Sequence, residues 1–196
     1  MNLTEMRARV REDLQDTDSQ NYRWIDGEID GAIERVVTEY SLVVPIEQQD
    51  DIATTGGDTE LDISSLSGLL EIESVEFPIG EQPKYLQRTE YWAGRLYMQD
   101  KGDGEDARVR WLKRHTLDAG GTTIPAEHEE IIVLGATGYL AMSASAYTVD
   151  RASIAGHHAT VNYKAWGKER LDRYDRKLKA ISHSSRVIQR TFYTED

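Results

Sequence analysis

The spacing of apolar residues changes twice along this chain of 196 residues, and this change constrains the fold more than any other feature. Apolar residues recur every three or four positions up to about residue 42 and again from about residue 118, as they do in amphipathic helices. Between residues 43 and 117 they alternate with polar residues, as they do in half-buried strands. The sequence therefore predicts an α+β protein, with a β-strand lobe inserted between the second and the third of four helices.

The expected units follow from these changes of pattern. We expect a helical core domain of residues 1–42 and 118–183, an inserted β lobe of residues 43–117, and an extended C-terminal docking tail of residues 184–196. The chain is long enough for one well-cored domain with an added lobe, and too short for two large domains. The tail has apolar residues between arginines, which is typical of a segment that docks on another surface.

Two helices are predicted at the start of the chain. In the first, Leu3–Leu14, Asn2 and Glu5 have the spacing of a capping box. The second begins at Asp26, the expected N-cap residue. Trp24, just before this cap, is expected to act as a hydrophobic staple and so to be a structural residue. The apolar stripe of the second helix consists of Ile29, Ile33, Val36, Val37 and Tyr40.

Six strands are predicted in the β lobe, with glycine-containing turns between them. The turns at Gly56–Asp58 and Asp103–Gly104 are expected to use the positive φ that glycine allows. The acidic stretch Asp100–Asp106 lacks the alternating ligands and the closing Glu of an EF-hand, so we expect no calcium site there. The predicted strands are Glu47–Thr54, Glu60–Ile63, Leu70–Phe77, Tyr85–Thr89, Leu96–Gln99 and Ala107–Leu112.

The third helix is expected to start at Pro125 and to end near Tyr147. It contains an uncharged run, Ile131–Val149, that approaches the length of a membrane span. Glycine and serine residues dilute this run, so we expect a buried central helix of a soluble bundle rather than a span. A loop is predicted over Thr148–His158, and a fourth helix from about Thr160 to Ser182.

Charge is distributed unevenly along the chain, whose net charge is -12. Residues 1–150 hold 13 Lys+Arg against 30 Asp+Glu, a balance of -17, whereas residues 151–196 hold 10 against 5, a balance of +5. The acidic total argues against nonspecific DNA binding over the whole surface, because such binding depends on Lys and Arg. The basic end is either a solvated helix face or a surface that binds a partner.

The sequence has none of the usual motifs of catalysis or cofactor binding. It has no cysteine, and among its five histidines only an adjacent pair lies close in sequence, with side chains that point in different directions. Gly135–Gly138 lies inside a predicted helix and has no lysine of a phosphate-binding loop. No serine lies in a nucleophile elbow. We therefore expect a protein that is not an enzyme and that has no metal or cofactor site.

The order of these signals resembles the head-tail connector family, the adaptor or head-completion proteins of long-tailed bacteriophages. The resemblance consists of a short arginine-rich helix, the segment Trp24–Ile29 at the start of an Asp-initiated helix, a helix end at Glu39–Ser41, and a later helix that starts at Ile124–Glu129. It implies a structural virion protein that forms a ring, expected to be a dodecamer, below the portal protein. This ring extends the DNA channel and joins the capsid to the tail.

The same resemblance implies the partners and the location of the protein. Beside other copies of itself and the portal, it would contact a tail-side connector, a stopper or a tail protein, and no membrane. DNA would pass through the channel without sequence-specific binding, and an acidic wall would repel it. The protein would be made in the host cytoplasm and would end in the virion at the head-tail interface.

Two sets of contact residues complete this hypothesis. In the family the C-terminal segment commonly reaches the portal, which here implies Arg186, Val187, Ile188, Arg190, Phe192 and Tyr193. Aromatic residues and arginine dominate interface hot spots, so the contacts between subunits are assigned to Trp24, Tyr40, Tyr147, Trp166 and Arg173.

Two other functions remain open. The chain could be a soluble protein-binding or regulatory module that works as a monomer or dimer without catalytic activity. A nucleic-acid-binding role for the fourth helix is disfavoured, because Glu169, Asp172 and Asp175 interrupt its basic face. The number of subunits in the purified particle separates the ring from the module.

Overall fold

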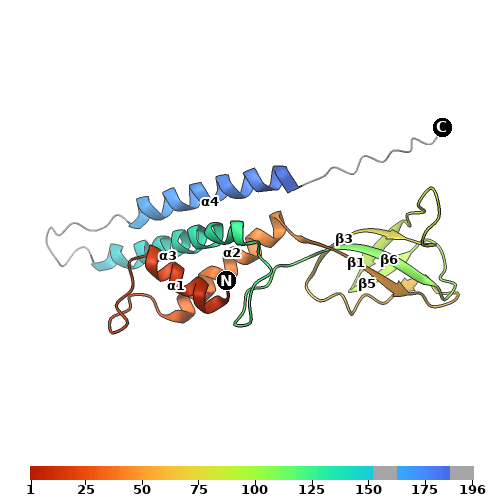
Figure 1. Ribbon diagram of the computed structural model, residues 1–196, viewed down its shortest axis with the longest axis horizontal. Coiled ribbons are helices and arrows are strands. Elements are labelled where there is room, and N and C mark those ends of the chain that lie inside the picture. The colour runs from red at the N-terminus through yellow and green to blue at the C-terminus, as the bar shows by residue number, and fades with distance from the viewer. Residues whose placement is uncertain (152–162, 186–196) are drawn as a thin grey trace. The chain divides into compact units, whose positions relative to one another are not determined.

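The structure is a computed structural model that describes the backbone of residues 1–151 and 163–185 and the side chains of residues 1–145 and 163–182. The chain forms two compact units, a helical unit of residues 1–44 and the chain from residue 116 onward, and a β unit, Pro45–His115 (Figure 1). The predicted α+β class, with helices on both sides of an inserted β lobe, is confirmed.

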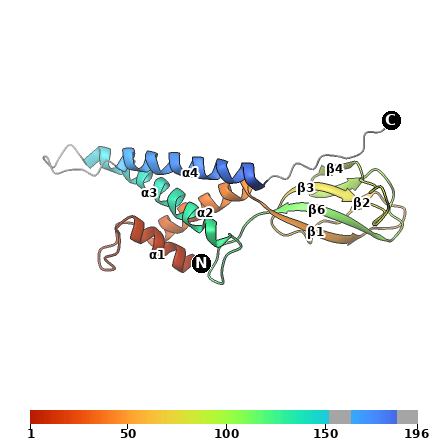
Figure 2. The ribbon, with the colours of Figure 1, turned by 45° about the horizontal axis from the view of Figure 1, so that its top comes forward.

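Within the described residues, the helical unit contains four α-helices, which Figure 2 labels, and one short 3₁₀-helix. They are α1 (Leu3–Asp13), α2 (Asp26–Val43), η1 (Ala126–His128), α3 (Glu129–Arg151) and α4 (Tyr163–Ser185). The predicted capping box is confirmed, since Asn2 Oδ1 accepts from the Glu5 backbone N–H at 2.9 Å and Glu5 accepts from the Asn2 N–H at 2.9 Å.

Three predicted helix boundaries need correction. Helix α3 starts at Glu129 and not at Pro125, because the three residues after Pro125 form the 3₁₀-helix η1. Helix α3 continues past Tyr147 to Arg151, so the first residues of the predicted loop Thr148–His158 are helical and the others lie outside the described residues. Ser184 and Ser185, predicted as the first residues of the tail, belong to helix α4, and the rest of the predicted tail is outside the described range.

The N-cap of α2 is Ile25 and not Asp26, as the sequence had suggested. Glu28 accepts a hydrogen bond from the Ile25 N–H at 3.0 Å, so this half of a capping box is present without a polar cap side chain. Asp26 becomes the first helical residue because its carboxylate binds Arg11 at 2.7 Å and Arg7 at 3.2 Å. These arginines come from α1. The sequence rules for helix caps consider only the residues next to the cap, so they do not include such distant partners.

The core of the helical unit is built around α3. The described part of its uncharged run is largely buried, as expected: Ile132 and Ala136 are fully inaccessible, and Leu140 is almost so. Residues from α1, α2 and α4, including Met6, Val36 and Tyr174, complete the core. No helix within the described ranges has both the length and the apolarity that a bilayer-spanning segment needs.

Glycines let α3 and α4 pack closely. A Cβ atom added at Gly167 of α4 would lie 3.0 Å from Ala141 Cβ, 3.1 Å from the Gly138 carbonyl oxygen and 3.1 Å from the Met142 nitrogen. A Cβ atom at Gly138 would lie 2.9 Å from the Leu171 side chain. The two helices can therefore keep this distance only while both positions have no side chain.

The β unit consists of two three-stranded antiparallel sheets, in the orders β1-β6-β3 and β2-β5-β4. The strands are β1 (Ile46–Ala53), β2 (Glu60–Leu61), β3 (Leu69–Glu76), β4 (Thr89–Trp92), β5 (Arg95–Met98) and β6 (Asp106–Lys113). Buried residues of both sheets, such as Val75, Leu96 and Val109, form a core of their own. The expected positive φ is present at Gly57 (83°) and Gly104 (98°).

One predicted strand, Tyr85–Thr89, is wrong. Here Leu86 makes only an isolated bridge to Glu76, and β4 begins at Thr89. The buried Gln87 side chain donates to the Phe77 carbonyl oxygen at 2.8 Å and to Asp100 at 2.9 Å. This segment therefore connects the end of β3 with the second sheet instead of forming a strand of its own.

Candidate functional site

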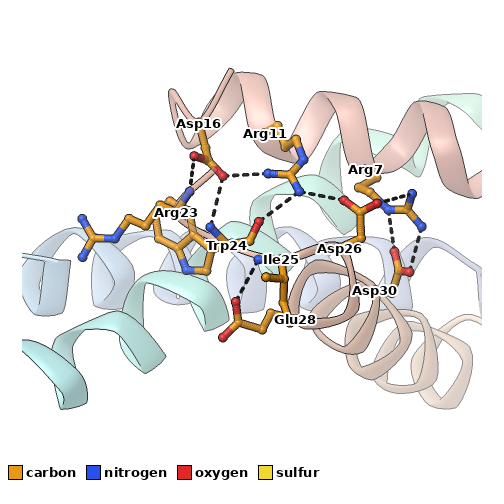
Figure 3. Close-up of polar contacts among 9 residues, drawn as sticks. All are labelled: Arg7, Arg11, Asp16, Arg23, Trp24, Ile25, Asp26, Glu28 and Asp30. Carbon is orange, nitrogen blue, oxygen red and sulfur yellow. Dashed lines mark hydrogen bonds and ion pairs between the residues drawn. The ribbon is translucent and has the colours of Figure 1, made fainter. Parts of the chain in front are cut away.

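A buried arginine organises the junction between α1 and α2 (Figure 3). Arg11 is 6% exposed, and its guanidinium donates to Asp16 Oδ2 at 2.7 Å, to the Trp24 carbonyl oxygen at 3.0 Å and to Asp26 Oδ1 at 2.7 Å. A buried cation needs such compensation, because desolvation alone would disfavour its charge. These contacts tie the loop between the two helices to α1 at Asp16 and Trp24, and tie the start of α2 to α1 at Asp26.

Asp16 holds that loop from the other side. Its carboxylate accepts from the Arg23 N–H at 2.8 Å and from the Trp24 N–H at 3.3 Å (Figure 3). The Trp24 ring is buried and makes an edge contact with the Tyr163 ring of α4, with centroids 6.3 Å apart. Trp24 thus joins the loop to α4 as a core residue, and its side chain offers little area to a second copy.

Asp26 gives the junction a dependence on pH. A hydrogen bond from Arg11 is the main cause that holds the pKa of Asp26 below its ordinary value. Such a carboxylate stabilises the fold above its unfolded pKa, and this contribution is lost as the pH falls through the folded pKa. We expect the free energy of unfolding to fall more steeply below about pH 4 in the wild type than in Asp26→Asn. Urea unfolding from about pH 6 to about pH 2 measures both slopes, and parallel slopes would contradict the assignment.

Tyr40, another residue predicted for subunit contacts, is fully buried. Its hydroxyl lies 2.5 Å from His128 Nδ1, and burial raises the pKa of Tyr40 to about 12. It therefore belongs to the core of its own subunit. Tyr147 lies in α3, but its side chain is outside the described residues, as are all six residues predicted to bind the portal.

The remaining two predicted contact residues, Trp166 and Arg173, lie on α4 with accessible side chains. This helix has seven Lys and Arg against three Asp and Glu, a balance of +4. Its exposed bases that form no ion pair with any described residue are Lys164, Lys168, Arg173, Arg176 and Lys179. Helix α4 is therefore the basic surface of the described helical unit.

Two cavities of about 380 and 390 Å³ meet where α1 approaches α4. Asp13 and Arg170 line both cavities and form an ion pair, while Trp166 lies under the Arg170 guanidinium at 4.5 Å. Burial, followed by the charge of Arg173, lowers the pKa of Arg170. The cavities combine apolar walls with paired charges, which suits the side chains of a protein partner.

Within the described chain, no group of three or more His, Cys, Asp or Glu could hold a metal ion.

A scan of protein-family models found no match for this chain, and neither did a search of the curated proteins.

A second surface lies on the β unit and was not predicted. Tyr91 and Trp92 are 56% and 72% exposed, and every residue of β4 is exposed. A two-residue turn, Ala93 (φ 51°) and Gly94 (φ 81°), follows them and places the pair at the tip of the β4–β5 hairpin. The sequence Ala93–Gly94 was the available signal for this exposure, because it indicates a turn directly after Trp92. A tryptophan beside a hairpin turn has fewer neighbours than one within a strand.

Proposed function

We propose that this chain is the subunit of a head-tail connector, which forms a ring below the portal of a long-tailed bacteriophage and extends the DNA channel toward the tail. The observation that supports this best is the exposed Tyr91–Trp92 pair on a β unit with its own core. An exposed aromatic pair of this kind is typical of protein-binding surfaces. In this proposal the helical unit binds neighbouring subunits, and the β hairpin binds the next protein on the tail side.

The charge of the chain is consistent with a conduit. The β unit has 15 Asp+Glu against 8 Lys+Arg, a balance of -7. Surfaces that bind phosphate groups need an excess of positive charge, whereas a channel wall with an excess of negative charge repels DNA. In a connector, such a wall lets the genome pass without being held.

The subunit number tests the proposal. Light scattering and negative-stain imaging of the protein, alone and mixed with the portal encoded beside it, should show a ring or ring-shaped density on the portal. Deleting residues 184–196 should remove that density, because the C-terminal segment is proposed to bind the portal through Arg186, Val187, Ile188, Arg190, Phe192 and Tyr193. A monomer that does not bind the portal would contradict the connector proposal.

The β hairpin gives a second prediction. In phage particles that carry Trp92→Ser, we expect DNA-filled heads that keep the connector ring but lack tails, because the tail-side contact loses its largest apolar residue. Electron microscopy counts the tailed and the tailless heads. Tyr85→Ser is the matched control, since Tyr85 is also exposed in the β unit but lies outside the hairpin. Equal loss of tails in both variants would contradict a specific role of the hairpin.

The alternative is a soluble protein-binding or regulatory module without catalytic activity. The exposed hairpin favours this function too, since it would serve a monomeric module equally well. A constant mass of one or two subunits at every concentration, with or without the portal, would support the module.

A further inference from the structure

Strand β4, which Figure 2 labels, is an outer strand of the second sheet and has one free edge. Among the described strands it pairs with β5 alone, and all of its residues, Thr89–Trp92, are exposed. An outer strand presents the backbone hydrogen-bonding groups that its neighbour does not use. These groups are available for a strand of another chain.

Two backbone hydrogen bonds determine which groups of β4 face the free edge. The Gln99 N–H donates to the Arg88 carbonyl oxygen at 3.0 Å, so the backbone of Arg88 is used on the β5 side. The Met98 N–H, which lies opposite Thr89, instead donates to the Thr59 carbonyl oxygen at 2.8 Å, away from β4. The backbone N–H and C=O of Thr89 therefore point away from β5.

The same holds for Tyr91, because the direction of the backbone groups alternates along an antiparallel strand. The free edge of β4 thus has the N–H and C=O groups of Thr89 and Tyr91, and these groups bond to no described residue. Natural proteins often protect such an edge with proline, lysine or a β-bulge. Strand β4 has none of the three. The edge is therefore open to pairing.

The side chains of β4 indicate what kind of strand fits there. Tyr91 lies opposite the buried Leu96, on the inner face of the sheet, and is nevertheless 56% exposed. Glu90 points to the other face, and its exposed carboxylate forms no ion pair with any described residue. An added strand would cover Tyr91 with apolar side chains on one face and meet Glu90 with a cation on the other.

A second copy of β4 fits this edge poorly. An antiparallel pair of two β4 strands that uses all the free groups must place Thr89 of each copy opposite Tyr91 of the other. This register puts the two Glu90 carboxylates directly opposite one another on one face, where like charges destabilise a sheet. A strand of a different protein that has a basic residue at this position avoids that repulsion.

We propose that β4 binds an extended segment of the tail-side protein as an added strand, in which an apolar, a basic and an apolar residue lie opposite Tyr91, Glu90 and Thr89. Main-chain hydrogen bonds supply affinity in such complexes, and the alternating side chains supply specificity. The inference rests on the proposed function and specifies how the β hairpin holds the next protein.

Peptide selection on the purified full chain tests the recognition pattern. Peptides enriched from a yeast-displayed library of random short peptides should share an apolar-basic-apolar pattern. The variant Glu90→Lys should select an acidic residue at the middle position, because the charge that it faces is reversed. The absence of a common pattern, or the same basic residue selected by both proteins, would overturn the proposal.

A proline variant tests the pairing itself. Thr89→Pro removes a free N–H and leaves the bonds to β5, since proline is tolerated where the N–H of an outer strand faces solvent. It should weaken the binding of a selected peptide roughly ten-fold, because a carbonyl group of the added strand loses its donor. Thr89→Val keeps the N–H and is the matched control, with the affinity of the wild type expected. Equal affinities of the two variants in calorimetric titrations would contradict the pairing.

Hydrogen exchange in the wild type tests the same contact without any substitution. A bound peptide should slow the exchange of the Thr89 and Tyr91 amides, which are free in the unbound chain. Unchanged exchange at both amides in the saturated complex would overturn the proposal, whatever the variants show. Circular dichroism spectra and thermal midpoints verify that the variants fold.

Phage particles test the identity of the partner. Thr89→Pro should give DNA-filled heads without tails, whereas Thr89→Val should give tailed particles. Tailed particles in both cases would overturn the assignment to the tail-side protein. A dimer of the isolated chain that Thr89→Pro abolishes would assign the edge to a second copy instead, and light scattering detects it.

The peptide measurements need neither the ring nor the portal, so the two proposals can fail separately. If the wild type forms the ring but no peptide pairs with β4, strand addition is overturned while the proposed function stands. If peptides bind as expected but no ring forms, alone or with the portal, the proposed function fails. Strand addition would then belong to the alternative, a protein-binding module.

Discussion

Arg11→Met is expected to lower the free energy of unfolding by about 3–5 kcal/mol, the largest effect among the substitutions considered. The substitution removes the cation that donates to Asp16, to the Trp24 carbonyl oxygen and to Asp26. Asp16 is itself buried, so its carboxylate would stay in the interior without its ion-pair partner. Urea unfolding at neutral pH, followed by circular dichroism and tryptophan fluorescence, measures the loss.

Arg7→Met is the matched control on the same helix. Arg7 donates to both carboxylate oxygens of Asp30, at 2.9 and 2.8 Å, so its geometry is at least as good as that of Arg11. Its side chain is more exposed, at 22% against 8% for Arg11, and water can replace the lost contacts. We expect a loss of at most about 1 kcal/mol. Equal losses for the two variants would contradict the claim that burial determines the effect.

Gly167→Ala is expected to destabilise the protein by about 1–3 kcal/mol, although alanine is the better helix former. The new methyl group would meet the Gly138 carbonyl oxygen and the Met142 nitrogen, both at 3.1 Å. These are backbone atoms of α3, so the helices must move apart and part of the core contact between them is lost. Thermal and urea unfolding measure the change.

Gly31→Ala is the same chemical change at an open position and should have the opposite sign. No atom lies within 4 Å of the added Cβ, so only the helix propensity and the unfolded-state entropy change. We expect a gain of roughly 0.5–1 kcal/mol for the monomer, measured below the concentration of assembly. A gain at Gly167 would show that the packing of α3 against α4 is not as described, and a loss at Gly31 would show that this position of α2 is not open.

Short-range features were predictable from the chain alone. The capping box of Asn2 and Glu5, the apolar stripe of α2 and the glycine turns depend on residues within a few positions of one another. The change of apolar period located the inserted lobe for the same reason, because each element must bury one face. The burial of the described part of the uncharged run in α3 followed from its lack of charge.

Contacts between distant residues were not predictable in this way. Arg11 binds Asp26 at the start of α2, whose N-cap is Ile25, while the segment Tyr85–Thr89 makes only an isolated bridge, between Leu86 and Glu76. The division of the aromatic residues between core and surface also depends on contacts between distant residues. The aromatic side chains are chemically similar, and the neighbours that bury some of them come from other parts of the chain.

The sequence by itself determined where the helices and most of the strands occur, because periodicity, caps and turns act over a few residues. Only the tertiary structure decided which aromatic and charged side chains reach the surface. Trp24 and Tyr40 are buried against Tyr163 and His128, which lie more than a hundred and almost ninety positions away, whereas Trp92 has no such cover at its hairpin tip. Burial depends on where the whole chain places its neighbours, and a local pattern contains no information about that.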